Sequence, residues 1–204
     1  MKPWSLVVAG VGGQGVITTA RLVGLGAIEA GLEARVGQIY GLSQRGGSVQ
    51  ATVRIGPVGT ALVPSAGADV VLGLEPLEAE RTLASMSPAT AVVVNSTPIV
   101  PTSLTLQRAD YPELETIIDQ IAAVAGSVRI VDGTARAEGL GNPRLANVVM
   151  LGALDGLELL PVPTEAMESA IRQGAGARDP ELLISAYRAG RELAAETSLS
   201  RMAE

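Results

Sequence analysis

The feature that most restricts the fold is a run of glycines between an apolar segment and an amphipathic one. Residues 5–10 have the sequence SLVVAG, residues 10–15 are GVGGQG, and residues 16–30 carry apolar side chains at spacings of three and four. A short apolar run that ends in glycine is typical of a buried strand, and the stripe is typical of a helix packed on a sheet. The sequence therefore predicts a strand, a tight turn and a helix in direct succession.

The rest of the chain alternates the same two patterns. Further strands are predicted at residues 34–39, 48–55, 68–74, 91–95 and 127–132, and helices at residues 76–85, 112–125, 142–157, 162–173 and 180–195. This alternation favours an α/β fold with a Rossmann-like, mainly parallel sheet flanked by helices. A length of 204 residues fits one domain. We therefore expect residues 1–204 to form a single domain with a helical C-terminal part at about 142–199.

The first glycine loop has the spacing of a dinucleotide-binding turn. Gly10, Gly12 and Gly15 match G-x-G-x-x-G, and the N-terminus of the following helix offers free N–H groups to an anion. A nicotinamide dinucleotide site also needs a carboxylate at the end of the second strand, but residues 38–40 are Gln-Ile-Tyr. Three interpretations remain open: a turn without a ligand, a site for an anionic or phosphate-bearing ligand, and a docking surface.

A second glycine-rich loop, GLSQRGG at residues 41–47, follows the second strand. Both loops are expected at the carboxyl edge of the sheet, where ligand clefts of α/β proteins form. The planar guanidinium of Arg45 suits a carboxylate or a phosphate, and Ser43 and Gln44 could orient a polar ligand. The alternative is a solvated loop with an ordinary surface arginine.

For the other conspicuous polar residues a structural role is favoured over contact with a ligand. Asn147 interrupts the apolar helix at 142–157 and is expected to be a buried amide bonded to backbone. Glu75 and Glu78 follow a predicted strand, and because acids favour the first turn of a helix, a solvated helix start is expected. Asp132 ends another strand and is expected to form a turn or cap.

Composition restricts the chemistry of this chain. It contains no Cys and no His, and Lys2 is its one lysine. Thiolate zinc sites, thiolate-ligated iron–sulfur clusters and Ser-His-Asp or Cys-His catalysis are therefore excluded within it. If the chain serves an enzyme, we expect the redox chemistry to lie in a partner.

Composition also restricts partners and location. A net charge of −6 and an aromatic content of 2% argue against nucleic acid. The longest apolar stretch, residues 146–162, is interrupted by acids and predicts no membrane span. The absence of Cys fits a cytoplasmic protein. The apolar content of 47% fits either a core built without Phe or a buried subunit interface.

Five segments of the chain together carry a resemblance to a known family. In family order they are GVGGQGV (10–16), YGLSQRGGSV (40–49), ADVVLGLEPLEAER (68–81), VVVNSTPIVP (92–101) and GNPRLANVVMLGAL (141–154). On these segments the chain is similar to the gamma-type domain of the 2-oxoacid:ferredoxin oxidoreductases, and most closely to the beta subunit of the indolepyruvate branch. The SQRGG form favours arylpyruvate over pyruvate or 2-oxoglutarate.

The resemblance implies a heteromeric complex that oxidatively decarboxylates a 2-oxoacid to an acyl-CoA, carbon dioxide and reduced ferredoxin. It implies that thiamine diphosphate, magnesium and iron–sulfur clusters belong to a partner alpha subunit, with coenzyme A (CoA) as cosubstrate and ferredoxin reached through the complex. It implies no catalytic or metal-binding residue in this chain. The residues it marks as candidate contacts for substrate or cofactor are Gly12, Gly13, Gln14, Gly15, Ser43, Gln44 and Arg45. A stand-alone nucleotide- or CoA-binding protein and a purely architectural subunit are the alternatives.

Overall fold

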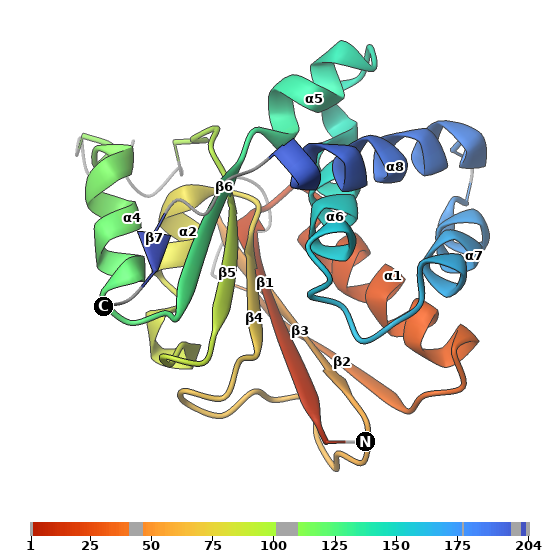
Figure 1. The fold of residues 1–204 in the computed structure, drawn as a ribbon, viewed down its shortest axis with the longest axis horizontal. Helices are drawn as coiled ribbons and strands as arrows, with labels where there is room; N and C mark the ends of the chain where they lie inside the picture. Colours follow the sequence, from red (N-terminus) through yellow and green to blue (C-terminus); the bar gives the residue numbers. More distant parts are fainter. Residues whose placement is uncertain (1, 41–46, 101–109, 177, 197–200, 203–204) are drawn as a thin grey trace.

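The computed structural model describes residues 2–40, 47–100, 110–176, 178–196 and 201–202. They form a seven-stranded sheet in the order β2-β3-β1-β4-β5-β6-β7 (Figure 1). The strands are β1 (Trp4–Val11), β2 (Ala34–Tyr40), β3 (Ser48–Ile55), β4 (Val70–Gly73), β5 (Ala91–Asn95), β6 (Ser127–Val131) and β7 (Arg201–Met202). β1, β4, β5 and β6 are parallel neighbours. β2 points the same way, since it is antiparallel to β3 and β3 is antiparallel to β1. The predicted mainly parallel sheet is confirmed.

Helices cover the sheet on two faces. Figure 1 shows α1, α6, α7 and α8 gathered on one side and α2 and α4 on the other. Each side encloses its own cluster of buried aliphatic residues. The helices are α1 (Val16–Glu29), α2 (Pro76–Glu80), α4 (Leu114–Ala122), α5 (Gly133–Gly139), α6 (Ala146–Gly156), α7 (Thr164–Gly174) and α8 (Pro180–Glu196), with short 3-10 turns at Leu83–Ser85 and Pro143–Leu145. Among the residues that the structure describes, no helix combines the length and the apolar character needed to cross a membrane.

Strand β3 has the predicted bounds, but it lies antiparallel between β1 and β2. β2 and β3 are therefore antiparallel neighbours and not parallel ones. The ends of β1 and β2 still share one edge of the sheet, as expected. There the backbone N–H of Gly12 donates to the carbonyl of Gly47 at 2.8 Å, which joins the first glycine loop to the start of β3.

The buried helix α6 is fixed by close contact with α8. Residues 147–154 of α6 are all buried, as its uniformly apolar sequence predicts. A Cβ at Gly152 would lie 1.9 Å from the carbonyl oxygen of Tyr187, and one at Gly190 would lie 1.9 Å from that of Val149. Two glycines thus let the helix backbones approach each other closely.

Helix α5 was not expected from the sequence. Asp132 is its N-cap, and the Asp132 side chain accepts a hydrogen bond from the N–H of Ala135 at 3.0 Å. The predicted cap role of Asp132 is therefore confirmed. The seven residues of α5 include two glycines and bury only Gly133 and Ala137, so they carry no apolar stripe that periodicity could detect.

Candidate functional site

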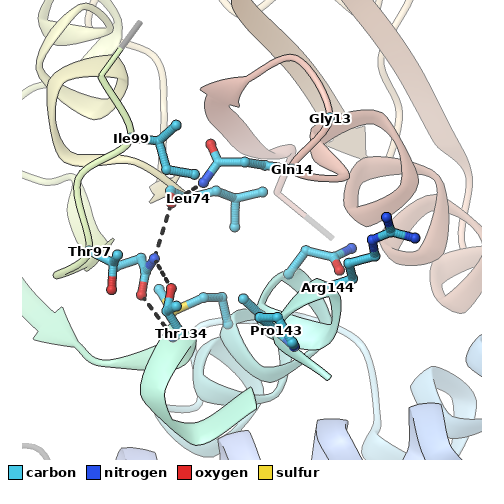
Figure 2. A pocket seen from close by; sticks show the side chains of 12 residues that line it. Gly13, Gln14, Leu74, Thr97, Ile99, Thr134, Pro143 and Arg144 are labelled. Atoms are coloured by element: carbon cyan, nitrogen blue, oxygen red, sulfur yellow. Dashed lines mark hydrogen bonds between the residues drawn. The ribbon is translucent and has the colours of Figure 1, made fainter. Parts of the chain in front are cut away.

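A cavity of about 340 Å³ lies at the carboxyl ends of the central strands. Figure 2 shows Gln14, Leu74 and Ile99 on one side of it and Pro143 and Arg144 across from them. The walls come from the glycine loop, from the residues after β4 and β5, and from the starts of α5 and α6. The lining residues are Gly13, Gln14, Leu74, Asn95, Thr97, Ile99, Thr134, Pro143, Arg144, Ala146, Asn147 and Met150.

The glycines of the first loop are required for two different reasons. Gly13 and Gly15 have φ angles of +110° and +85°, which disfavour other residues. A Cβ at Gly13 would meet nothing within 4 Å, so this backbone is open to the cavity. A Cβ at Gly15 would lie 2.6 Å from the side-chain nitrogen of Asn147. Gly15 therefore allows α1 to approach α6.

Gln14 fastens this loop to the neighbouring strand. Its Oε1 accepts a hydrogen bond from the N–H of Val11 at 2.7 Å, and its Nε2 donates to the carbonyl of Leu74 at 2.8 Å. Sequence reasoning proposed Gln14 as a ligand contact. The side chain does line the cavity, and its amide also holds the turn against the end of β4.

Asn95, which sequence reasoning missed, organises the opposite wall. Its Oδ1 accepts from the N–H groups of Gly133 and Thr134 at 3.0 and 3.3 Å. Its Nδ2 donates to Thr134 Oγ1 at 2.9 Å and to the Leu74 carbonyl at 3.3 Å (Figure 2). The signal was present in the sequence as a single amide at the end of the apolar run AVVVN.

Asn147 is buried, as predicted, with 6% of its surface exposed. The partner expected from the sequence was backbone, and this is corrected. The Asn147 Nδ2 donates to Thr19 Oγ1 at 3.3 Å, and that hydroxyl donates to the carbonyl of Gly15 at 3.0 Å. Because Asn147 also lines the cavity, it links the cavity floor to the first turn of α1.

Among the described residues that line the cavity, Arg144 is the one with a charge. It is exposed and forms no salt bridge within the described ranges. The described part of the lining contains no carboxylate, thiol or imidazole. Its hydroxyls, amides and single guanidinium suit the binding and orientation of an anionic ligand better than proton transfer.

Glu75 and Glu78 are fully buried, which overturns the expected solvated helix start. The Glu75 carboxylate caps α2 by accepting from the N–H of Glu78 at 2.9 Å, and it also accepts from Tyr111 Oη at 2.5 Å and from the N–H of Ile99 at 3.3 Å. Burial raises the pKa of Glu75 above its ordinary value, and the nearby Glu78 charge adds to this, while these hydrogen bonds oppose it. Through Ile99, Glu75 holds one wall of the cavity.

The structure brings Gly12, Gly13, Gln14 and Gly15 together between two hollows. Gly13 and Gln14 line the main cavity, and a second hollow of about 260 Å³ lies at the start of α1. No side chain caps that helix, and its first residues, Val16, Ile17 and Thr18, line this second hollow. The other candidates, Ser43, Gln44 and Arg45, lie outside the described residues.

Comparison with known sequences gives one family. Residues 5–193 match the family model described as pyruvate ferredoxin/flavodoxin oxidoreductase. A curated relative from Archaeoglobus fulgidus, indolepyruvate oxidoreductase subunit IorB, is 39% identical over 186 residues, which are 91% of this chain and 92% of that protein.

Solved structures show the same fold. Pyruvate oxidoreductase subunit PORC from Thermotoga maritima superposes with a TM-score of 0.73 at 23% identity, covering 98% of this chain and 100% of that one. The 2-oxoglutarate:ferredoxin oxidoreductase from Magnetococcus marinus, with 2-oxoglutarate, CoA and succinyl-CoA bound, gives a TM-score of 0.76 at 20% identity. All of this chain is matched by 33% of that one.

Proposed function

Because this chain belongs to the pyruvate ferredoxin/flavodoxin oxidoreductase family, as a subunit of a 2-oxoacid:ferredoxin oxidoreductase, we propose that it is the subunit without a redox group. Together with a partner alpha subunit it converts a 2-oxoacid, CoA and oxidised ferredoxin to an acyl-CoA, carbon dioxide and reduced ferredoxin. The oxoacid is an arylpyruvate such as indolepyruvate, which the name of the curated relative supports.

The chemistry of the cavity carries this proposal. Its lining offers amides, hydroxyls and the Arg144 guanidinium, which bind and orient a ligand. The residues of this chain do not fit an iron–sulfur cluster, because it has no Cys or His. Thiamine diphosphate, magnesium and the clusters are accordingly assigned to the partner, where they supply decarboxylation and electron transfer. This chain shapes the approach of substrate or CoA.

Reconstitution tests the assignment. The chain and the cluster-bearing partner are produced separately and mixed, and reduction of a viologen dye is followed with indolepyruvate and CoA. We expect turnover only from the mixture, and a series of arylpyruvates, pyruvate and 2-oxoglutarate then identifies the oxoacid. Equal activity of the partner alone would contradict the proposal.

Arg144 gives the cavity its own test. If the guanidinium holds an anionic group of substrate or CoA equally in the ground and transition states, Arg144→Ala raises KM for that ligand and leaves kcat nearly unchanged. Arg144→Lys keeps the charge but loses the planar fork, so it restores KM only in part. Unchanged KM values for both the oxoacid and CoA in Arg144→Ala would contradict the proposal that this cavity binds either ligand.

Arg45 separates ligand contact from a purely architectural role. If Arg45 forms a buried charged pair, Arg45→Ala weakens ligand binding by about 2–5 kcal/mol, and Arg45→Lys does not fully rescue it. If the loops only pack against the partner, Arg45→Ala leaves the reconstituted activity intact.

The cavity also supports a second candidate, a stand-alone CoA- or nucleotide-binding protein. This reading predicts that the purified chain alone binds CoA tightly. A calorimetric titration with CoA that shows no heat, together with an unchanged melting temperature, would discard it.

A further inference from the structure

In the part of the chain that the structure describes, one half of the sheet has a face on which no helix packs. The cluster of buried residues under α2 and α4 draws on β1, β4, β5 and β6 and on no residue of β2 or β3. The other face of β2 and β3 packs against α1, where a Cβ at Gly24 would touch Val36. Side chains alternate along a strand, so Arg35, Gly37 and Ile39 point away from α1.

This face, which the loop through Ala61 and Leu62 covers in part, contains two arginines in direct opposition. Arg35 of β2 is the register partner of Arg54 of β3. Like charges at directly opposed positions of an antiparallel pair destabilise it. Within the described ranges neither guanidinium has a carboxylate at salt-bridge distance. Among the described residues, Arg54 donates to two neutral oxygens, the Ser5 hydroxyl at 3.3 Å and the Leu62 carbonyl at 3.4 Å.

Exposed aliphatic side chains accompany the two charges. Ile39 is 52% exposed and Leu62 is 62% exposed. The loop that carries Leu62 is held against β3, because Thr52 Oγ1 donates to the Ala61 carbonyl at 2.8 Å. We call the set formed by Arg35, Ile39, Gln50, Arg54 and Leu62 the outer strand face. It lies beside β2, the edge strand of the sheet.

We propose that the outer strand face is the docking surface for a carboxylate-bearing patch of the partner oxidoreductase subunit. The identity of the partner rests on the proposed function, whereas the carboxylate character of its docking patch is inferred from the arginine pair. Carboxylates would remove the Arg35–Arg54 repulsion, and an apolar centre would cover Ile39 and Leu62. The chain as a whole has 21 acidic and 15 basic residues, so this positive face differs locally from its net charge.

Charge also disfavours a second copy of this chain as the occupant. A twofold interface brings the same patch of each copy together, which would gather four arginines with no counter-charge. An acidic partner is complementary, and complementary charges set both partner choice and the rate of association.

Charge reversal at Arg35 separates docking from folding. In Arg35→Glu the new carboxylate faces Arg54, so the isolated chain keeps or gains thermal stability. The same change places a negative charge against an acidic partner. We expect the Kd for the partner to rise at least tenfold and the salt dependence of binding to weaken. Activity returns at saturating partner concentration.

Arg21→Glu is the matched control. It makes the same charge change at an exposed position of α1, on the opposite face of β2 and β3, where Arg21 lines a hollow with Ala34 and Val36. We expect its Kd to stay within twofold of the wild-type value. Leu62→Ala, which truncates an exposed side chain, should weaken binding without lowering the melting temperature.

The outcomes separate this proposal from the proposed function. A wild-type chain that binds the partner, with Arg35→Glu binding equally well or Arg21→Glu weakened equally, overturns the docking surface alone. A wild-type chain that shows no affinity for the partner overturns both. Self-association of the wild-type chain that Arg35→Glu abolishes would assign the face to a second copy and overturn the proposal.

Discussion

At the scale of single residues, the sequence located the glycine turn but not the network of hydrogen bonds around it. The spacing of Gly10, Gly12 and Gly15 predicted a tight turn after a strand, because few other sequences permit one. That Glu75 would be buried could not be predicted, since acids at a helix start are ordinarily solvated. Its partners, Ile99 and Tyr111, lie 24 and 36 residues away in the chain.

Gly15 and Asn147 should be energetically coupled. Gly15→Ala forces a left-handed backbone, at about 1–2 kcal/mol, and pushes its Cβ against the Asn147 amide. In an Asn147→Ala background only the backbone cost remains. We expect urea unfolding of the four proteins to give a coupling energy of about 0.5–3 kcal/mol. Additive effects would show that the amide does not restrict this position.

The raised pKa of Glu75 predicts a pH dependence of stability. A raised folded-state pKa favours the protonated carboxyl, so this stabilisation is complete below the ordinary value of 4.5 and is lost as pH rises through the raised value. Glu75→Gln cannot ionise. The free energy of unfolding of the wild type relative to this variant should therefore fall from pH 4.5 towards neutrality, as measured by urea titrations at several pH values.

Glu168→Gln is the control with the opposite sign. The hydrogen bonds from Arg188 lower the pKa of Glu168, so its stabilisation is present above the ordinary pKa and is lost as pH falls through the lowered value. The wild type should gain stability over this variant as pH rises. If the stability difference from the wild type changed with pH in the same direction for both variants, the opposite pKa shifts of Glu75 and Glu168 would be contradicted.

At the scale of elements, periodicity predicted most helices and strands because their burial is periodic. β3 and β5 have the predicted bounds, since each ends at a clear change of polarity. The direction of β3 could not be predicted from the sequence, because side chains alternate in the same way in parallel and antiparallel strands. Helix α5 was missed because its surface is too polar to show a stripe.

The glycines of the α6–α8 contact should not tolerate alanine. At Gly152 and Gly190 the added Cβ meets backbone, which cannot rotate away. Overpacking costs about 1–3 kcal/mol, which outweighs the gain of about 1 kcal/mol in helix propensity. We expect Gly190→Ala to lower the urea midpoint, and Gly139→Ala, whose Cβ meets nothing within 4 Å, to be neutral or slightly stabilising. Equal midpoints would contradict the close contact.

At the scale of the whole molecule, the sequence predicted the glycine loop at the carboxyl edge of the sheet, but it did not predict which residues form the opposite wall of the cavity. Its far wall comes from Pro143, Arg144, Asn147 and Met150. Apolar periodicity indicated that the helix carrying Asn147 and Met150 is buried, but it carries no information about which element that helix packs against.

Assembly should change β2 more than the helical side of the molecule. β2 is the edge of the sheet, and the amides on its open side have no strand partner. If the outer strand face docks the partner, amide hydrogen exchange in residues 34–40 slows in the complex, while peptides from α8 exchange as before. Mass spectrometry of the free and assembled chain measures both. Unchanged exchange in β2 would argue for docking elsewhere.

A single atom ties together two borders of the cavity. The carbonyl oxygen of Leu74 accepts one hydrogen bond from the Gln14 side chain on the glycine turn and another from the Asn95 side chain, which also binds the start of α5. Displacing the end of β4 would therefore disturb both borders at once. We expect a ligand that displaces the glycine turn to displace the start of α5 as well. The cavity should therefore widen by a coordinated movement of both borders.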